Sequence, residues 1–467
     1  MDLIASIPMV GGLLSVVIPF IIAISMVVFV HELGHLLVGR MAGIHARKFS
    51  IGFGPALIAR TDRHGTVWQV AAIPLGGMVL FLGEADGIHK RDEVDGEEGS
   101  TETAAAREER AEIEAIPEEL REKSFDRASV AGRAATIFAG PFFNFVLAAI
   151  LFAGVALWSG IEAQPLRVGE LVEVPGQPNE LEIGDEILAV NGVAVASMSG
   201  FSQAVRNMET PAPVTLDILR DGRAMEVLSA YPLAPVVAFI QPFSAASRAG
   251  ILPDDLIQSV NGTPIVSFRE LLEAVETSEG NPLALGILRD GRETAITLAP
   301  EVVDTETADG FEKRYRIGVG MDRTITPALT TPGPVEAIRL GVTGVWQVIS
   351  VSGKAIKHLF LGNLGLDNIQ GPIGIAQLSG EQARLGVIDF VQFVGVISVS
   401  IGFLNLFPIP ILDGGRLVFI AYEAVAGRPP PDRLLDVVMP VGLAMVLLLM
   451  LFATYNDLIR LAANLTS

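Results

Sequence analysis

The sequence HELGH at residues 31–35 holds the residue types of a metal-dependent hydrolase. It ends an apolar run, residues 13–30, that contains no charged residue. A helix turns about 100° per residue, so His31 and His35 project from one face about one turn apart. Two neutral imidazoles there can hold one Zn²⁺, and Glu32 stands where it can take a proton from an attacking water. The alternative is a pair of helix-face histidines satisfied by backbone or water, although His and Glu are costly within a membrane span.

The composition predicts an integral membrane protein. Half of the 467 residues are hydrophobic, the mean hydropathy is +0.49, and about 20 apolar residues suffice to cross a bilayer's hydrocarbon core. Such stretches recur in residues 1–43, 128–160, 385–412 and 434–460, which predicts four transmembrane helices in a lipid bilayer. There is no cysteine, so a zinc ion must use His and carboxylate ligands. The net charge of −20 argues against nucleic acid as a partner.

Basic residues beside the predicted spans set the expected orientation. Arg40 lies near the end of the first span, Arg133 lies near the start of the second, and Arg416 and Arg433 lie between the third and the fourth. Because positive charge near a span favours the cytoplasmic side, both termini should face outward and the HELGH sequence should lie toward the cytoplasm. The first apolar run lacks a basic leader and is interpreted as a retained span rather than a cleaved signal.

Residues 44–83 are rich in glycine and β-formers, which predicts short strands and tight turns. Exposed strand edges cannot lie in lipid, so this element must face protein or a wet cavity. An edge beside a protease centre can hold an extended substrate by strand addition, whereas the alternative is an ordinary cytoplasmic hairpin. The next segment, residues 84–127, has 16 acidic and 7 basic residues and is predicted to be a solvated cytoplasmic insertion.

The second span is interrupted early by the sequence GPFFN at residues 140–144. Asn144 places a polar group at membrane depth, where it needs a hydrogen-bonding partner. The sequence leaves a packing role and a functional role for this residue equally open.

An internal repeat follows the second span. Residues 184–192 match residues 254–262, and the sequence LDILRDGR at 216–223 matches LGILRDGR at 285–292. Both matches have an offset of about 70 residues, and each unit predicts strands, a helix and a tight hairpin. The units, at 161–232 and 233–325, resemble α+β PDZ domains of bacterial proteases. They are expected to lie in the periplasm, where they either bind peptide termini by strand addition or act as a steric cap.

Residues 326–384 are expected to form an amphipathic region on the membrane surface. The third span then ends in NLFPIPILDGG at residues 405–415, where two prolines break the helix. A catalytic zinc keeps three protein ligands, and Asp413 is the best candidate for the third, with a helix N-cap as its alternative role. Asn405 can donate to the substrate carbonyl or position the substrate strand, and its alternative is a structural role in the turn. Residues 413–433 are expected on the cytoplasmic side.

The two motifs together resemble the site-2 protease family, zinc enzymes of regulated intramembrane proteolysis, here with two tandem PDZ domains. The resemblance implies His31, His35 and Asp413 as zinc ligands and Glu32 as the general base. It implies substrates that are transmembrane proteins of the bacterial inner membrane, such as an anti-sigma factor trimmed on its periplasmic side, together with remnant signal peptides. The PDZ units would exclude untrimmed substrates by size. The resemblance further implies that residues 73–79 form a membrane-re-entrant strand that holds the substrate, with Ile73, Pro74, Leu75, Gly76 and Gly77 as the residues expected to bind it.

Two other classes of function compete with an active protease. One is a catalytically inactive membrane PDZ scaffold or chaperone with the same fold. The other is a transporter whose intramembrane polar groups bind an ion, which leaves the PDZ repeat unexplained. The intact set of His31, Glu32, His35 and Asp413 favours the protease.

Overall fold

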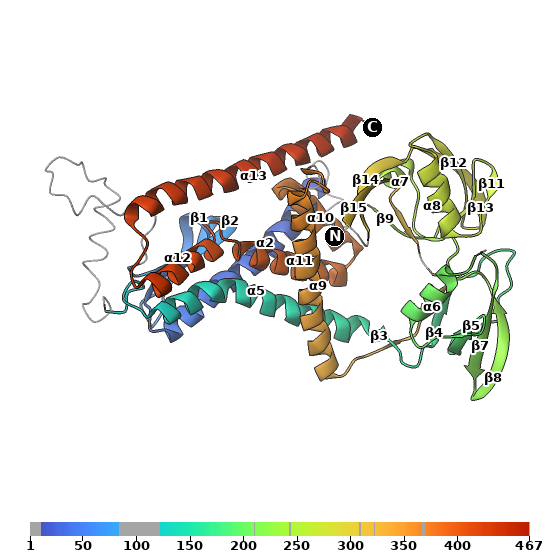
Figure 1. Ribbon diagram of the computed structural model, residues 1–467, viewed down its shortest axis with the longest axis horizontal. Coiled ribbons are helices and arrows are strands. Elements are labelled where there is room, and N and C mark those ends of the chain that lie inside the picture. Colours follow the sequence, from blue (N-terminus) through green and yellow to red (C-terminus); the bar gives the residue numbers. More distant parts are fainter. Residues whose placement is uncertain are drawn as a thin grey trace. The chain divides into compact units, whose positions relative to one another are not determined.

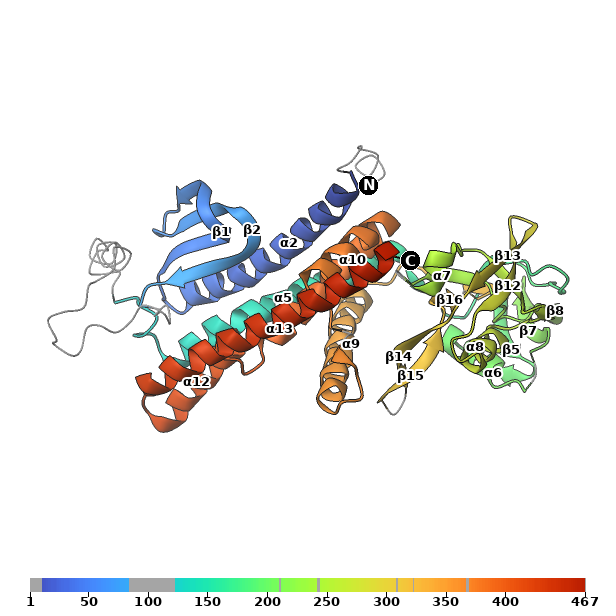
Figure 2. The ribbon, with the colours of Figure 1, turned by 90° about the horizontal axis from the view of Figure 1, so that it is seen from above.

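The computed structural model describes residues 11–83, 122–209, 211–241, 244–307, 310–321, 323–366 and 369–466 (Figures 1 and 2). The chain divides into two compact units. The first comprises residues 1–155, 335–353 and 369–460, and the second comprises residues 156–334, 354–368 and 461–467. Most of the predicted acidic insertion, residues 84–121, lies outside the described residues.

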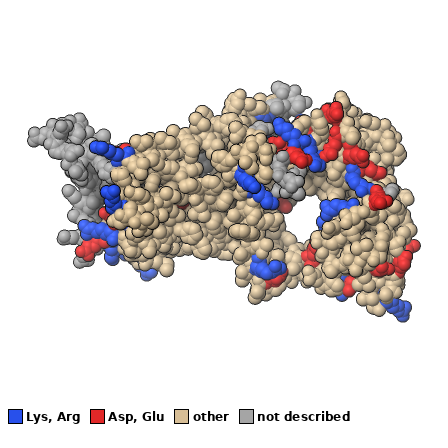
Figure 3. Space-filling view, in the orientation of Figure 1, with Lys and Arg blue, Asp and Glu red and all other residues tan. Residues whose placement is uncertain are grey.

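Within the described residues, four helices are long and apolar enough to cross a membrane, in agreement with the four predicted spans. They are α2 (Gly11–Met41), α5 (Val130–Ser159), α11 (Val387–Asn405) and α13 (Asp432–Thr466). Only 6% to 28% of each apolar window is buried inside the protein. The remaining apolar side chains face outward and require lipid, and the helical part of the surface in Figure 3 shows few charged side chains.

Helix α2 lies between α5 and a β-sheet, as Figure 2 shows. Glycine permits the close approach to α5, since a Cβ on Gly34 would lie 2.5 Å from the carbonyl oxygen of Ala139. On the sheet side, a Cβ on Gly77 would lie 2.8 Å from Val28. The HELGH residues therefore lie between helix α5 and this β-sheet.

The sheet consists of two long bent strands, β1 (Ala46–Thr61) and β2 (Val67–Phe81). Positive φ angles of 85° at Gly52 and 95° at Gly76 allow the bends. The first part of β1 pairs with residues 77–81 on one side and with the start of β2 on the other. The predicted hairpin is thus a four-segment ladder, and residues 77–81 form one of its edges.

The second unit contains two four-stranded sheets with the same strand order, β6-β5-β7-β8 and β11-β10-β12-β13. Each hairpin supplies an arginine to a buried aspartate: Arg220 pairs with Asp185 at 2.7 Å, and Arg289 pairs with Asp255 at 2.7 Å. This ion pair explains why the Arg-Asp-Gly-Arg sequence recurs. The first sheet has β5 (Glu186–Val190), β6 (Val193–Ala194), β7 (Val214–Arg220) and β8 (Arg223–Ser229) with helix α6 (Met198–Arg206). The second has β10 (Leu256–Val260), β11 (Thr263–Pro264), β12 (Leu283–Arg289) and β13 (Arg292–Leu298) with helix α8 (Phe268–Thr277).

The two repeats are not simply consecutive along the chain. Strand β17 (Ile325–Pro327) pairs with β4 (Val168–Leu171), and β18 (Leu329–Thr330) pairs with β3 (Ile161–Glu162). Ile325 accordingly packs into the core of the first repeat. The second repeat is inserted between the main part of the first repeat and strands β17 and β18. It also contains helix α7 (Ala245–Ala249), strands β9 (Val237–Ile240) and β16 (Val319–Met321), and the hairpin β14–β15 (Glu301–Thr307, Gly310–Arg316).

The predicted amphipathic region contains two helices, α9 (Pro334–Phe360) and α10 (Pro372–Leu385). Helix α9 is not among the candidate spans. Asp457 of α13 accepts the backbone N–H groups of Gly371 and Gly374 at 3.1 and 2.9 Å, so a buried carboxylate holds the N-terminus of α10. After α11, the loop 406–412 leads into α12 (Asp413–Ala426).

Candidate metal centre

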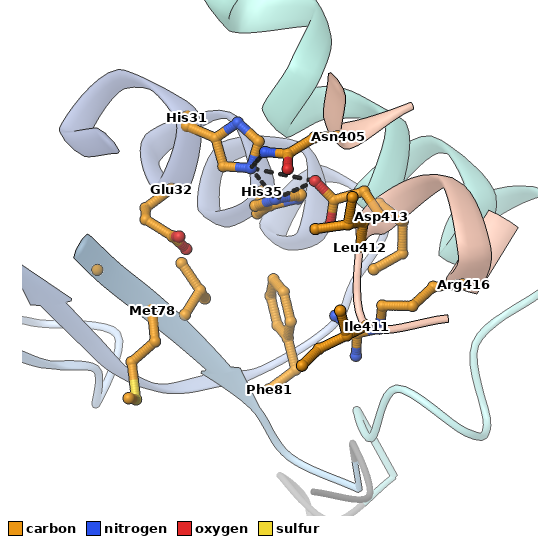
Figure 4. Close-up of a pocket in the computed structure, with 13 residues that line it drawn as sticks. His31, Glu32, His35, Met78, Phe81, Asn405, Ile411, Leu412, Asp413 and Arg416 are labelled. Carbon is orange, nitrogen blue, oxygen red and sulfur yellow. Dashed lines mark hydrogen bonds and ion pairs between the residues drawn. The ribbon is translucent and has the colours of Figure 1, made fainter. Parts of the chain in front are cut away.

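Two imidazoles and one carboxylate converge inside the first unit (Figure 4). The Nε2 atoms of His31 and His35 lie 3.2 Å apart, and Asp413 Oδ2 lies 3.1 Å from the former and 3.6 Å from the latter. Both histidines are 7% exposed. Among the described residues, these three form the group able to share one metal ion.

The path of the chain explains how Asp413 reaches the helix of the histidines. Leu412 is the N-cap of α12, so Asp413 is the first helical residue rather than the cap, and its side chain faces the imidazoles. A Cβ on Gly414 would lie 2.3 Å from the backbone of Leu406, and one on Gly415 would lie 2.2 Å from a loop carbonyl. The two glycines therefore allow the proline-containing loop to fold back against the first turn of α12.

The donor set fits zinc in both spacing and chemistry. Zn–N and Zn–O bonds of about 2.0–2.1 Å in a tetrahedron separate neighbouring ligand atoms by roughly 3.3 Å, and the three distances above lie on either side of that value. The Nδ1 atom of His35 donates to the main-chain carbonyl of Thr136 at 2.9 Å, which leaves Nε2 unprotonated for a metal. His31, His35 and Asp413 would hold the ion and leave its fourth position open. A zinc ion at such a site is a Lewis acid that polarises carbonyls and lowers the pKa of water to about 7.

Glu32 lies beside this group and lines the same cavity, which has a volume of about 250 Å³. Figure 4 shows its carboxylate next to the histidines and above the strand that carries Met78. The main chain of β2 lies next to this side chain, since a Cβ on Gly77 would lie 3.1 Å from Glu32 Cγ, so the edge of β2 limits where the carboxylate can lie. A carboxylate here can take a proton from a water molecule that attacks a bound peptide bond.

Comparison with known proteins agrees with this geometry. The model of peptidase family M50 matches residues 19–449. The chain belongs to peptidase family M50. It is 34% identical to a protein named as a zinc metalloprotease from Rhizobium meliloti (strain 1021), over 94% of this chain and 95% of that protein. It is 33% identical to the regulator of sigma-E protease RseP of Escherichia coli (strain K12), over 95% of this chain and 98% of the relative. It is 32% identical to the corresponding regulator of Salmonella typhi, with the same two coverages.

Family membership and the His-His-Asp group make this chain a zinc metalloprotease with four candidate membrane spans. The expected enzyme class, cofactor and RseP-like architecture are therefore confirmed. The transporter hypothesis is set aside, because an M50 enzyme accounts for the polar groups within the spans.

The other predicted site residues are Asn405 and five residues of β2, and they differ in how they lie relative to the His-His-Asp group. The Nδ2 atom of Asn405 is 3.5 Å from His31 Nε2, so this amide lies directly beside the metal position (Figure 4). Gly77 lines the cavity. Gly76 lies at the bend of β2, and the side chain of Ile73 is 52% exposed. Pro74 and Leu75 belong to the same strand, and the substrate-binding role of all five strand residues stays a prediction.

The structure adds residues that the sequence interpretation did not place at the site. Phe81 lines the cavity two residues beyond the predicted substrate strand at 73–79, whose Met78 and Val79 line it as well. Gly140 is another, because a Cβ there would lie 2.3 Å from His35 Nε2 and 2.8 Å from His31 Nε2. The GPFFN interruption of the second span was the available signal, but only the packing of α5 on α2 shows what it faces.

Proposed function

We propose that this M50 enzyme is an intramembrane endopeptidase that hydrolyses peptide bonds within transmembrane segments of other membrane proteins. The observation that carries the proposal is the position of the metal group. His31 and His35 end an apolar helix of transmembrane length, and Asp413 meets them from the loop after another candidate span. A peptide bond that reaches this group must come from a segment at membrane depth.

The residues of the site divide the chemistry among them. Glu32 takes a proton from the attacking water and returns it to the leaving amine. The amide of Asn405 lies where it can donate to the scissile carbonyl oxygen as negative charge develops there. Apolar residues of the cavity, including Phe81 and Ile137, limit access of bulk water.

The edge of the β-sheet supplies a way to hold the substrate. A transmembrane helix satisfies its own backbone hydrogen bonds, so the bond to be cut becomes accessible only after local unwinding. Residues 77–81 form an edge of the β1–β2 ladder and contribute Gly77, Met78, Val79 and Phe81 to the cavity. Pairing of the unwound segment with this edge would replace the lost backbone bonds.

The candidate substrates follow from the relatives. Several of them are named regulators of sigma-E protease, which supports a membrane-bound anti-sigma factor as the substrate class, with remnant signal peptides as a second source. In this proposal the PDZ repeats bind peptide termini or exclude substrates that still carry a periplasmic domain.

The proposed orientation places both termini and the PDZ repeats in the periplasm and the metal group toward the cytoplasm of a bacterial inner membrane. Basic residues support it: Arg40 ends α2, Arg133 begins α5, and Arg428 and Arg433 precede most of α13. Figure 3 shows Lys and Arg gathered at one end of the helical part of the surface, beyond an uncharged middle.

The decisive experiment compares wild type with Glu32→Gln in purified, reconstituted full-length protein. Gln keeps the size of the side chain and lacks a basic carboxylate, so we expect cleavage of a model transmembrane substrate to fall below detection while one zinc per chain is retained. The matched control is Glu226→Gln at an exposed position of strand β8, and this variant should cleave normally. Normal cleavage by Glu32→Gln would rule out the proposed base, and absence of cleavage by wild type with every transmembrane substrate tested would favour the scaffold alternative.

Asp413→Ala tests the metal group separately. Because two imidazoles alone hold zinc weakly, we expect the purified variant to lose most of its zinc, measured by mass spectrometry of the metal. Full zinc occupancy in Asp413→Ala would place the third ligand elsewhere.

A further inference from the structure

Asn144 is a buried polar residue for which the mechanism above has no use. It lies on α5, one turn beyond Gly140, and is 0% exposed. Its Nδ2 atom is 3.2 Å from Nδ1 of His31. Its Oδ1 atom is buried and has no hydrogen-bond partner among the described residues. A buried amide oxygen without a partner costs about 1–3 kcal/mol, so its surroundings require an explanation.

The protonation of His31 resolves this arrangement. Nε2 of His31 faces Asp413 and must be unprotonated to bind a metal, so the neutral ring carries its proton on Nδ1. An N–H at Nδ1 needs an acceptor, which the NH₂ group of Asn144 is not. A 180° rotation of the Asn144 amide about its Cβ–Cγ bond places Oδ1 opposite Nδ1 of His31. One hydrogen bond from the Nδ1 N–H to Oδ1 then gives a partner to each of these two groups.

The inference rests on the proposed metal centre and extends it. We propose that Asn144 is a positioning residue that accepts the Nδ1 proton of His31 and thereby holds this imidazole in the metal-binding tautomer. Thr136 does the same for His35 through its main-chain carbonyl at 2.9 Å. Both acceptors belong to α5, so the second span orients both histidines of the first.

Packing fixes the Asn144 side chain in place. The hydroxyl of Ser398 on α11 donates to the main-chain carbonyl of Asn144 at 2.9 Å. A Cβ on Gly402, one turn further along α11, would lie 3.1 Å from the Asn144 Cβ. Because α11 closes over this residue, the amide has little freedom except rotation about its own axis, and its orientation can be set by His31.

The test measures metal binding in the purified full-length protein in detergent. Asn144→Asp keeps an acceptor opposite Nδ1, whereas Asn144→Leu has a similar shape and none. Asn144→Ala serves as a second apolar variant in case the leucine does not fold. Ser398→Ala is the matched control, because it removes a buried hydrogen bond to the same residue without touching the imidazole. Zinc affinity is measured by competition with a chromophoric chelator, and the ligand geometry by the visible spectrum of the Co²⁺-substituted protein.

We expect the apolar variants to bind zinc roughly 10–100-fold more weakly than wild type and to change the Co²⁺ spectrum, since loss of a second ligand-orienting bond typically has this effect. Asn144→Asp and Ser398→Ala should bind zinc much as wild type does. Wild-type affinity in the apolar variants, or equal losses in Asn144→Asp and Asn144→Leu, would overturn the inference. So would an equal loss in Ser398→Ala, which would indicate general packing. Absence of zinc binding by wild type would overturn the metal centre as well, which separates the two failures.

Discussion

At the scale of single residues, the proposed metal site depends on glycine as well as on its three candidate ligands. The two imidazoles lie against the backbone of α5 at Gly140, where any side chain would occupy the space of the rings. Gly34 serves the same contact from α2, where a Cβ would lie 2.9 Å from the ring of Phe143. Side chains larger than hydrogen at these two positions would displace the two imidazoles, even with all three candidate ligands present.

Gly140→Ala should therefore disable the enzyme without removing a ligand. The added methyl group would displace His35 and His31, and a misplacement of about 1 Å at a reacting centre can cost about 100-fold in rate. We expect cleavage of a model substrate to fall by at least that factor and zinc content to fall with it.

Gly154→Ala on the same helix is the control for this variant, because nothing lies within 4 Å of its added Cβ. It should cleave normally and be as stable as wild type, or more stable by up to about 1 kcal/mol from improved helix propensity. Equal effects of the two substitutions would contradict the steric argument.

At the scale of elements, a hydrogen-bond network ties the β-sheet to the helix of the histidines. Asp62, in the loop between β1 and β2, accepts hydrogen bonds from Arg40 at the end of α2 and from Trp68. It also accepts the backbone N–H groups of His64 and Thr66 at 2.8 and 3.0 Å. Residues 77–81, the edge segment beside the cavity, belong to the same ladder, so this network also helps to fix their position.

Acid should loosen this connection. Partial burial raises the pKa of the Asp62 carboxyl, but hydrogen bonds from Trp68 and Arg40 and from two backbone N–H groups outweigh it and hold the pKa well below its ordinary value of 3.8. A lowered native pKa means that the stabilisation is complete above pH 3.8 and is lost as the pH falls through the native value.

Fluorescence of Trp68, measured in a Trp158→Phe/Trp346→Phe background, should therefore change in the pH range below 3.8. Asp62→Asn should remove that transition. A transition that persists unchanged in Asp62→Asn would assign it to another group.

At the scale of the whole molecule, the chain combines a membrane-spanning metalloprotease with a nested pair of PDZ-like repeats. Strands β3 and β18 pair antiparallel, with Ile161 opposite Thr330. The segment that contains both repeats therefore begins and ends at neighbouring points in space. Paired residues in such strands have Cα atoms about 5 Å apart. The repeats are therefore removable as one insertion, provided that β17 and β18 are removed with them.

Replacing residues 161–330 by a short Gly-Ser linker tests the proposed size exclusion. We expect the shortened protein to cleave a trimmed transmembrane substrate as wild type does, and to cleave in addition a substrate that keeps its periplasmic domain. Continued rejection of the untrimmed substrate by the shortened, active protein would assign the selectivity to the membrane unit.

The sequence by itself determined the features that depend on local spacing. HELGH on one helix face, four apolar stretches and a repeat of about 70 residues each follow from periodicity or composition, and each has its counterpart in the structure. The partner of His31 on α5 and the space opposite Gly140 were decided by tertiary structure, because they depend on contacts between residues more than 100 positions apart. The same holds for Ile325, which completes the first repeat from beyond the second. Local patterns record which residues share a face, and only packing determines what that face meets.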